Sequence, residues 1–145
     1  PKVCTTKRRF EVLKIFRENG IPTVVWFSPL LPFINDTREN MEGILDYCIE
    51  AGVYGVICFG IGVTLREGDR EYFYRKLDEH FPEMRERYHR KYGYAYEVVS
   101  DNNRELMSRF HEICRKNNMV SDMDKIFAYL REFPKDKGYE QMSLF

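Results

Sequence analysis

The residues of this chain best suited to bind a ligand follow two predicted strands. Ser28 comes directly after the apolar run Thr23–Phe27, and the Gly-Ile-Gly segment Gly60–Gly62 comes directly after Val53–Phe59. In sheets of parallel strands, ligands bind in the crevice at the carboxyl ends of the strands. The Ser28 hydroxyl could reach a ribose or a carboxylate there, or it could bond the local backbone instead. The two glycines could admit a flat ring against the backbone, and a plain turn is the competing interpretation.

A charged cluster and the cysteines give further signals. A charged cluster lies just past the glycines. It could be a solvated helix start, or it could contact a substrate. The cluster consists of Arg66, Glu67, Asp69 and Arg70. The four cysteines show no CxxC or other metal-ligand spacing, so they predict buried free thiols in a reducing compartment. They are Cys4, Cys48, Cys58 and Cys114. The histidines are scattered among charged residues, and we expect no metal site.

Two β-α units must position the residues at the strand ends. Apolar residues at helical spacing predict a helix around Phe10–Phe16, ended by Gly20. A second helix is predicted from Asp36, with an acidic residue three positions on, to Gly52. Strand, helix and strand in this order imply a parallel pair with a right-handed crossover. The first strand is apolar on both faces, which predicts cover on each side, and we expect Trp26 in the core.

The second half of the chain predicts mainly helices. We expect one helix capped by Asp69, one starting at Pro82, an amphipathic one ending at Asn117, and a last one capped by Ser121. The run Tyr94–Val99 is too short to assign. The fold class is therefore α/β, with two central parallel strands followed by a helical carboxyl-terminal region.

Two strands with helices on one side make half of an architecture. They leave sheet edges unpaired and one face uncovered, which isolated domains usually avoid. We therefore expect a piece of a larger barrel or open sheet, with some self-association through the open edge. The predicted parts are residues 1–66 with the two β-α units, residues 67–134 as a helical region packed on them, and residues 135–145 as a polar linker and tail.

The composition indicates a globular chain with no net charge. It has 145 residues, a hydrophobic fraction of 43%, and 23 basic residues against 23 acidic ones. Zero net charge gives no bulk attraction to nucleic acid or to a membrane surface. No apolar run approaches the roughly 20 residues of a membrane span, and no signal peptide is visible. We expect a cytoplasmic protein without a membrane partner.

Four blocks, in order along the chain, resemble one family. They are Pro1, Thr5 and Arg9 in PKVCTTKRRF, the loop PLLPFIND, the helix end AGVYGVICFG, and GIGVTLREGDREYFYRKLDEHFP. Together they resemble the carboxyl half of radical S-adenosylmethionine (SAM) proteins of the spore photoproduct lyase type, also labelled DNA repair photolyase-like. The resemblance runs from Pro1 to Leu130. The loop and the last block are specific together, whereas either alone would be weak.

The resemblance implies a partial (β/α)6 TIM-like barrel. In that family an N-terminal CxxxCxxC motif binds a [4Fe–4S] cluster, which holds SAM and cleaves it reductively to a 5′-deoxyadenosyl radical. This sequence lacks the motif, so we expect the fragment alone to be inactive and its partner to be the missing N-terminal half of the barrel. For SAM binding the resemblance implies Ser28, Gly60, Ile61, Gly62 and Arg9. A structural role for Arg9 is the alternative.

The resemblance also implies a nucleic acid substrate and a reaction like DNA repair. Arg66 and Arg70 would contact that substrate. The stretch Arg85–Tyr92 mixes Tyr88 and Tyr92 with four Lys or Arg residues, which could stack on bases and contact phosphates. A solvated amphipathic helix explains the same stretch.

The last five residues read QMSLF and resemble the short peptide with which many bacterial replication and repair proteins bind the sliding clamp. A polar linker would present Gln141, Met142, Leu144 and Phe145 to a groove on that partner. A tail folded onto its own helices would look the same. The alternative for the whole chain is a non-catalytic α/β interaction module that docks to a repair or replication complex through this tail.

Overall fold

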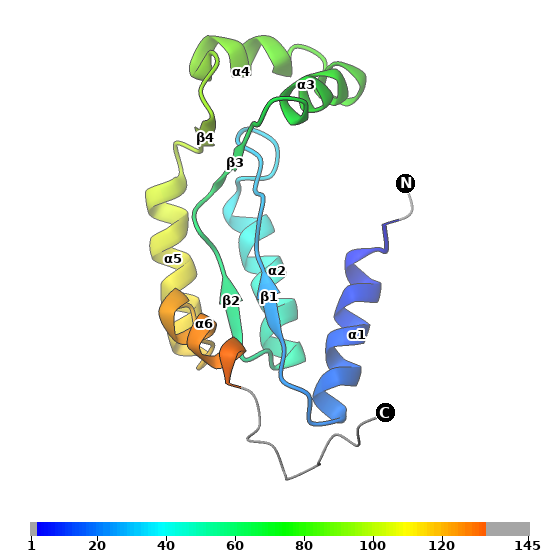
Figure 1. Cartoon of the computed structure of the whole chain (residues 1–145), viewed down its shortest axis with the longest axis vertical. Coiled ribbons are helices and arrows are strands. Elements are labelled where there is room, and N and C mark those ends of the chain that lie inside the picture. Colours follow the sequence, from blue (N-terminus) through cyan, green and yellow to red (C-terminus); the bar gives the residue numbers. More distant parts are fainter. Residues whose placement is uncertain (1–2, 133–145) are drawn as a thin grey trace, which may run out of the picture.

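The computed structural model describes residues 3–132, which form a mixed α/β fold (Figure 1). Within that range six helices accompany four short strands, which pair into two separate two-stranded sheets. These sheets do not close into a barrel within residues 3–132. In the same range no helix has the length and hydropathy to cross a bilayer. The elements are α1 (Thr6–Glu18), β1 (Val24–Trp26), α2 (Arg38–Ala51), β2 (Gly55–Ile57), β3 (Gly62–Thr64), α3 (Asp69–His80), α4 (Met84–Tyr92), β4 (Glu97–Val99), α5 (Asn103–Lys116) and α6 (Met123–Arg131).

The strands β1 and β2 form the parallel pair that the sequence predicts. Their register sets Val24 beside Gly55 and Trp26 beside Ile57, and α2 connects them. Each strand is three residues long and so shorter than the predicted apolar run. Backbone pairing continues one residue further, because the Phe27 N–H donates to the Ile57 carbonyl at 2.8 Å. The predicted strand-helix-strand unit is confirmed.

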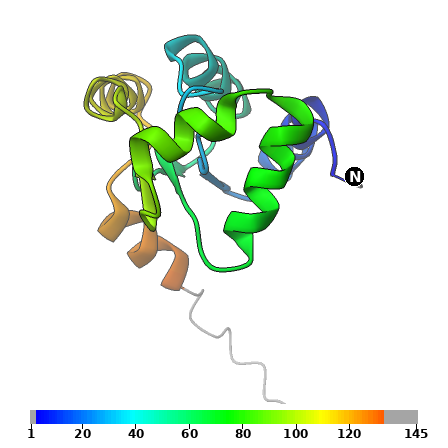
Figure 2. The same cartoon turned by 90° about the horizontal axis from the view of Figure 1, so that it is seen from above.

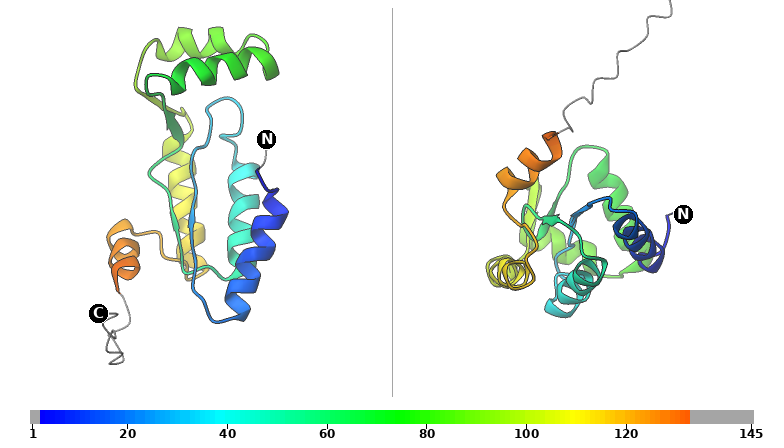
Figure 3. Two further views of the ribbon diagram at one scale, coloured as in Figure 1. Left: turned by 45° about the vertical axis from the view of Figure 1, so that its right-hand side comes forward. Right: turned by 90° about the horizontal axis from the view of Figure 1, so that it is seen from below.

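Helices α2 and α5 cover one face of this sheet, and α1 packs on α2 (Figure 3). The side chains of Val25 and Phe27 point to that face, since both belong to the core that α2 and α5 share. The Phe27 ring stacks on Phe110 of α5 with ring centroids 6.1 Å apart. The same core includes Met41, Leu45, Cys48, Val56, Cys58, Leu106, Ile113 and Cys114.

The opposite face of the sheet is covered only in part, by α6 (Figure 3). A Cβ placed on Gly55 would lie 2.6 Å from the Val120 carbonyl oxygen and 3.3 Å from Ile126 Cδ1. Glycine therefore lets α6 and the segment before it approach β2 closely. Towards the carboxyl end of β1 the cover stops, and Trp26 is 58% exposed. The prediction that Trp26 lies in the core is wrong.

A second, antiparallel sheet is a feature that the sequence analysis does not predict. It pairs Gly62 with Val99 and Thr64 with Glu97, so β4 interrupts the region predicted as helical. From this sheet α3 and α4 extend beyond the carboxyl ends of β1 and β2 (Figures 1 and 2). Their own core consists of Leu65, Tyr74, Leu77, Tyr88 and Val98. We call α3 and α4 the cap.

The predicted helix ends are confirmed, whereas four predicted helix starts are displaced. The helix predicted to start at Pro82 begins at Met84. Gly20 follows α1 with φ of +70°, and Gly52 ends α2 with φ of +62°. The side chains that cap α2 and α6 belong to Thr37 and Asp122, each one residue after the predicted cap. At α3 the Glu71 carboxylate accepts from the Gly68 N–H at 2.7 Å, so Asp69 lies inside the helix.

Candidate functional site

Ser28 lies at the carboxyl end of β1 with its side chain exposed. Within residues 3–132 its hydroxyl makes no hydrogen bond, so the local backbone does not occupy it. The hydroxyl is therefore available to a ligand at the strand end. The bond to the local backbone, which was the alternative for Ser28, is absent within residues 3–132, and the binding role stays a prediction.

The segment Gly60–Gly62 divides into one open residue and two engaged ones. Gly60 has φ of +139°, a conformation that only glycine adopts readily. A Cβ placed on it would lie 3.3 Å from Asn103 Oδ1. Ile61 is buried, and its N–H donates to Asn103 Oδ1 at 2.7 Å. A Cβ on Gly62 would lie 2.4 Å from the Val98 carbonyl oxygen. Gly62 is thus required by the pairing of β3 with β4, and only Gly60 is free to face a ligand.

Arg9 is exposed on α1, a helix that buries none of its residues. No hydrogen bond or ion pair joins it to Ser28 or Gly60 within the described range. The structure does not bring Arg9 into contact with the strand ends.

Arg66 and Arg70 both contact the residues that precede β4, but their side chains have different roles. Arg70 Nη2 donates to the carbonyl oxygens of Leu65, Tyr94 and Ala95 at 3.0, 3.2 and 2.9 Å. These bonds fasten the start of α3 to the strand segments and leave Arg70 a structural role. Arg66 is exposed and donates to the Tyr96 hydroxyl at 3.2 Å, which raises the pKa of the guanidinium above its usual value. Arg66 remains accessible to a substrate.

The proline-braced loop between β1 and α2 is held from both sides. Tyr88 of α4 donates its hydroxyl proton to the Pro32 carbonyl at 2.6 Å, and burial raises the pKa of that phenol. Asn35 Oδ1 accepts from the Leu31 N–H at 2.5 Å. Because these groups are fixed, the loop forms a rigid wall beside the strand ends, as its prolines predict. The sequence gives no signal for the part played by Tyr88.

Tyr88 and its neighbours on α4 also limit the nucleic acid contact suggested for this helix. Tyr88 is fully buried and so offers no ring face to a base. Arg85 is paired with Asp78 at 2.5 Å, and Lys91 is paired with Asp101. Arg87 lies over the Phe33 ring at 3.9 Å. Most of this basic stretch therefore serves the packing of the cap.

An exposed aromatic pair at the strand ends is the feature that the sequence analysis misses. Trp26 and Phe59 have ring centroids 5.4 Å apart and ring planes tilted by 56°. They are 58% and 65% exposed. Trp26 is the last residue of β1, and Phe59 lies two residues past the end of β2. Their place at the carboxyl ends of neighbouring parallel strands is the signal that could have identified them.

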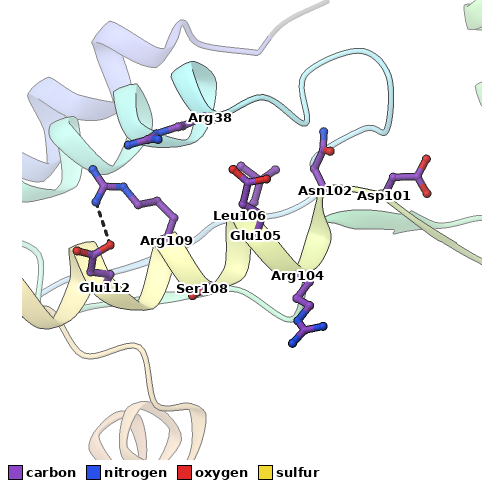
Figure 4. Close-up of a pocket in the computed structure, with 9 residues that line it drawn as sticks. All are labelled: Arg38, Asp101, Asn102, Arg104, Glu105, Leu106, Ser108, Arg109 and Glu112. Atoms are coloured by element: carbon purple, nitrogen blue, oxygen red, sulfur yellow. Dashed lines mark hydrogen bonds and ion pairs between the residues drawn. The ribbon is translucent and has the colours of Figure 1, made fainter.

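A charged groove lies between α2 and α5 (Figure 4). Its central side chain, Arg109, is bound to Glu42 at 2.7 Å and to Glu112 at 3.0 Å. Hydrogen bonds from Lys116 and Arg109 lower the pKa of Glu112 to about 2. Since Arg109 of α5 binds Glu42 of α2, these paired charges act as a clasp between the two helices. It is lined by Arg38, Asp101, Asn102, Arg104, Glu105, Leu106, Ser108, Arg109 and Glu112.

Three of the four cysteines are buried free thiols, as predicted, and Cys4 is exposed. Burial raises the pKa of Cys48 to about 12 and that of Cys114 to about 11. No group of three or more His, Cys, Asp or Glu side chains among the described residues is arranged to hold a metal ion. The QMSLF sequence, Gln141–Phe145, lies outside the described residues.

Comparisons with known proteins find distant relatives. The chain is 31% identical over 88 residues to uncharacterized proteins of Mycobacterium bovis and of two strains of Mycobacterium tuberculosis. The matched region is 61% of this chain and 25% of each relative, so the chain spans about a quarter of the length of the curated relatives it matches. No family model matches the sequence. No solved structure matches it either.

Proposed function

We propose that this chain is the carboxyl part of a radical SAM enzyme of the spore photoproduct lyase type that acts on nucleic acid. The observation that carries the proposal is the open parallel edge of β1, beside strand ends that present Ser28 and Gly60. The sequence resemblance supplies the family, and the length of the mycobacterial relatives agrees with a larger parent protein.

The edge of β1 has the geometry of an interrupted parallel sheet. Between the two strands the Tyr54 N–H donates to the Thr23 carbonyl, and the Phe27 N–H donates to the Ile57 carbonyl, each at 2.8 Å. Successive residues of a strand direct their N–H and C=O groups to alternate sides. Val24 and Trp26 therefore direct theirs away from β2, and no strand within residues 3–132 pairs with that side. Further parallel strands of the same protein would satisfy these groups.

The residues at the strand ends fit SAM in part. The free hydroxyl of Ser28 suits a ribose or carboxylate, and Gly60 leaves room for a flat ring. The N–H of Ile61 and the position of Gly62 are already used by the fold. SAM bound to a [4Fe–4S] cluster supplies a 5′-deoxyadenosyl radical, and the residues that hold the cluster would belong to the rest of the parent. Ser28 and Gly60 would bind and orient SAM.

The experiment is to express the longer reading frame that contains this chain and to reconstitute it with iron and sulfide. We expect a CxxxCxxC motif upstream and release of 5′-deoxyadenosine from SAM under reduction, measured by chromatography. Ser28→Ala should raise the KM for SAM by roughly 2- to 10-fold, the effect of one lost hydrogen bond. The control is Ser108→Ala, which changes an exposed serine at a different place, on α5. A reading frame without the motif, or a cluster-loaded protein that releases no 5′-deoxyadenosine, would overturn the proposal.

A further inference from the structure

We propose that two copies of this chain pair through a self-complementary surface formed by α1 and α2. In this pairing α1 of one copy lies against α2 of its partner. The two helices lie side by side (Figure 3), and the grooves on their exposed surface are lined only by residues of these two helices. The inference goes beyond the proposed function and does not depend on it.

The side chain of Tyr47 on α2 stands between the two grooves of this surface. It lines both of them and is 41% exposed. Its ring contacts Phe10 of α1, with ring centroids 4.9 Å apart, and Ile15 on α1 is 48% exposed. Aromatic side chains of this amphipathic kind are enriched at protein interfaces. The surface therefore has an apolar centre that a single copy leaves partly open to solvent.

The grooves on either side of Tyr47 differ in charge. The α1 groove is lined by three basic and two acidic residues, which are Lys7, Arg8, Lys14, Glu11 and Glu18. The α2 groove is lined by three acidic residues, which are Glu39, Asp46 and Glu50. Over its whole length α1 has five basic and two acidic residues, whereas α2 has one basic and four acidic ones. The two helices therefore carry opposite net charges of equal size.

Most of these charges are not used to hold the two helices of one copy together. Lys14 and Glu50, 2.9 Å apart, form the one ion pair between α1 and α2 within residues 3–132. In the same range Lys7, Glu39 and Asp46 have no ion pair. These three side chains belong to exposed residues, so their charges remain accessible to a partner.

A second copy of the chain is the partner that matches this surface. A partner of a single charge sign, such as nucleic acid, would be repelled by one of the two helices. A twofold axis brings α1 of each copy onto α2 of the other, so both helices meet the opposite charge at once. The helices have 13 and 14 residues. Each is therefore about 20 Å long, so the interface is small and we expect a weak dimer.

Gly43 gives a second reason for the close approach of another helix. It lies inside α2 and lines the α2 groove, and a Cβ placed on it would meet nothing within 4 Å. Glycine weakens a helix relative to alanine, and no contact within residues 3–132 requires glycine at this position. Because Gly43 has no side chain, the backbone of a partner helix can come close to α2 there.

The test reverses the charge of each helix separately. Sedimentation velocity of this chain, from about 1 µM to about 300 µM, should show a monomer–dimer equilibrium. Glu39→Lys/Asp46→Lys makes both helices basic, and Lys7→Glu/Arg8→Glu makes both acidic. We expect each variant alone to dimerise at least about tenfold more weakly, because every change occurs twice in the dimer. An equimolar mixture of the two variants should form a heterodimer, since opposite charges then face each other at both contacts.

Two further variants separate this surface from general effects of charge and folding. Gly43→Gln places a side chain in the open space on α2 and should weaken the dimer by about tenfold. Circular dichroism of the same variant should show unchanged helix content. The control Glu105→Lys/Asp124→Lys alters the net charge by the same amount at exposed positions on α5 and α6. This control should dimerise as the unsubstituted chain does.

Three results would overturn the proposal. The first is a monomer at every concentration. The second is a dimer that both charge-reversed variants retain unchanged, as association through the open edge of β1 would give. The third is a mixture of the two variants that forms no heterodimer. None of these measurements involves SAM or a cluster, so this proposal and the proposed function can fail independently.

Discussion

The hydroxyl of Ser100 donates a hydrogen bond to the carboxylate of Asp36, and both side chains are buried. Ser100 directly follows β4, whereas Asp36 ends the proline-braced loop after β1. The Asn102 N–H donates in turn to Ser100 Oγ at 3.0 Å. This pair therefore joins the loop beside the strand ends to the start of α5, and it explains why Asp36 is not available to cap α2.

Removal of the Ser100 hydroxyl should loosen this connection. Ser100→Ala leaves the Asp36 carboxylate buried without that donor, and we expect a loss of about 1–3 kcal/mol in the free energy of unfolding. Urea denaturation followed by circular dichroism measures the loss. Ser108→Ala, at an exposed position on α5, is the control. Equal stabilities of the two variants would contradict the role of the pair.

Gly62 and Gly43 should respond to alanine in opposite directions. A Cβ on Gly62 meets the Val98 carbonyl oxygen at 2.4 Å, so Gly62→Ala should cost about 1–3 kcal/mol by forcing β3 and β4 apart. A Cβ on Gly43, inside α2, meets nothing within 4 Å. Gly43→Ala should stabilise the protein by up to about 1 kcal/mol through helix propensity. Thermal unfolding of both variants tests this contrast, and a tolerated Gly62→Ala would disprove the close approach.

The thiols should separate into one reactive and three protected groups. Cys4 is exposed, whereas burial raises the pKa of Cys48 to about 12 and that of Cys114 to about 11. The thiolate is the reactive form, so a disulfide reagent at pH 8 should modify only Cys4 in the folded protein. Denaturant should expose all four cysteines of the sequence. Fast modification of a second thiol in the folded state would show that the main core is open.

The clasp between α2 and α5 should depend on pH in a defined direction. Arg109 hydrogen-bonds Glu42 and Glu112, and the pKa of each carboxyl is lowered in the folded state. A carboxyl group whose pKa is lower in the folded state stabilises the fold at pH values above its unfolded pKa of 4.5. This stabilisation is lost as the pH falls towards the folded-state pKa of about 2. Arg109→Ala should therefore lower the Tm at pH 7, by an amount that shrinks between pH 4.5 and pH 2. Arg115→Ala, on the same helix without an ion pair in the described range, should show no such trend.

The tail motif can be tested as an isolated peptide. A peptide of the last residues should bind a bacterial sliding clamp in a fluorescence polarisation titration, because its glutamine and terminal apolar side chains suit a groove on a partner. Replacement of Leu144 and Phe145 by alanine should abolish binding. If the substituted peptide binds equally well, the QMSLF motif is not a clamp ligand.

Local sequence signals predicted the first part of the fold well. Gly20 and Gly52 mark the ends of α1 and α2 because each adopts a positive φ that few other residues tolerate. The apolar spacing of α2 and the runs on either side of it are enough to predict a parallel pair. In contrast, β3 and β4 are three residues each and contain no usable alternation, so only their pairing with one another defines them.

The differences between the sequence analysis and the structure near the strand ends have a common physical origin in tertiary contacts. The apolar run Thr23–Phe27 suggests burial on both faces of the sheet, and no local signal shows that α6 leaves the Trp26 side chain uncovered. Asp36 has the type and position of a cap, yet its carboxylate is used by a residue 64 positions away. Arg70 has the charge of a substrate contact, yet its guanidinium binds three backbone carbonyls. Ser28, Gly60, Arg66 and Arg9 are not buried in the structure, and their binding roles stay predictions.

The bridge between Gly55 and Val120 is a long-range contact that bears on the order in which the elements fold. It is flanked by the bonds from Val56 to the Val120 carbonyl at 2.8 Å and from Val120 to the Tyr54 carbonyl at 3.0 Å. These contacts join residues 65 positions apart (120 − 55), so the entropy of closing that long loop must be met before they form. The contact of α5 with α2 spans a similar separation, since Arg109 lies 67 positions from Glu42. We therefore expect the local unit of β1, α2 and β2 to form before α5 and α6 dock on it.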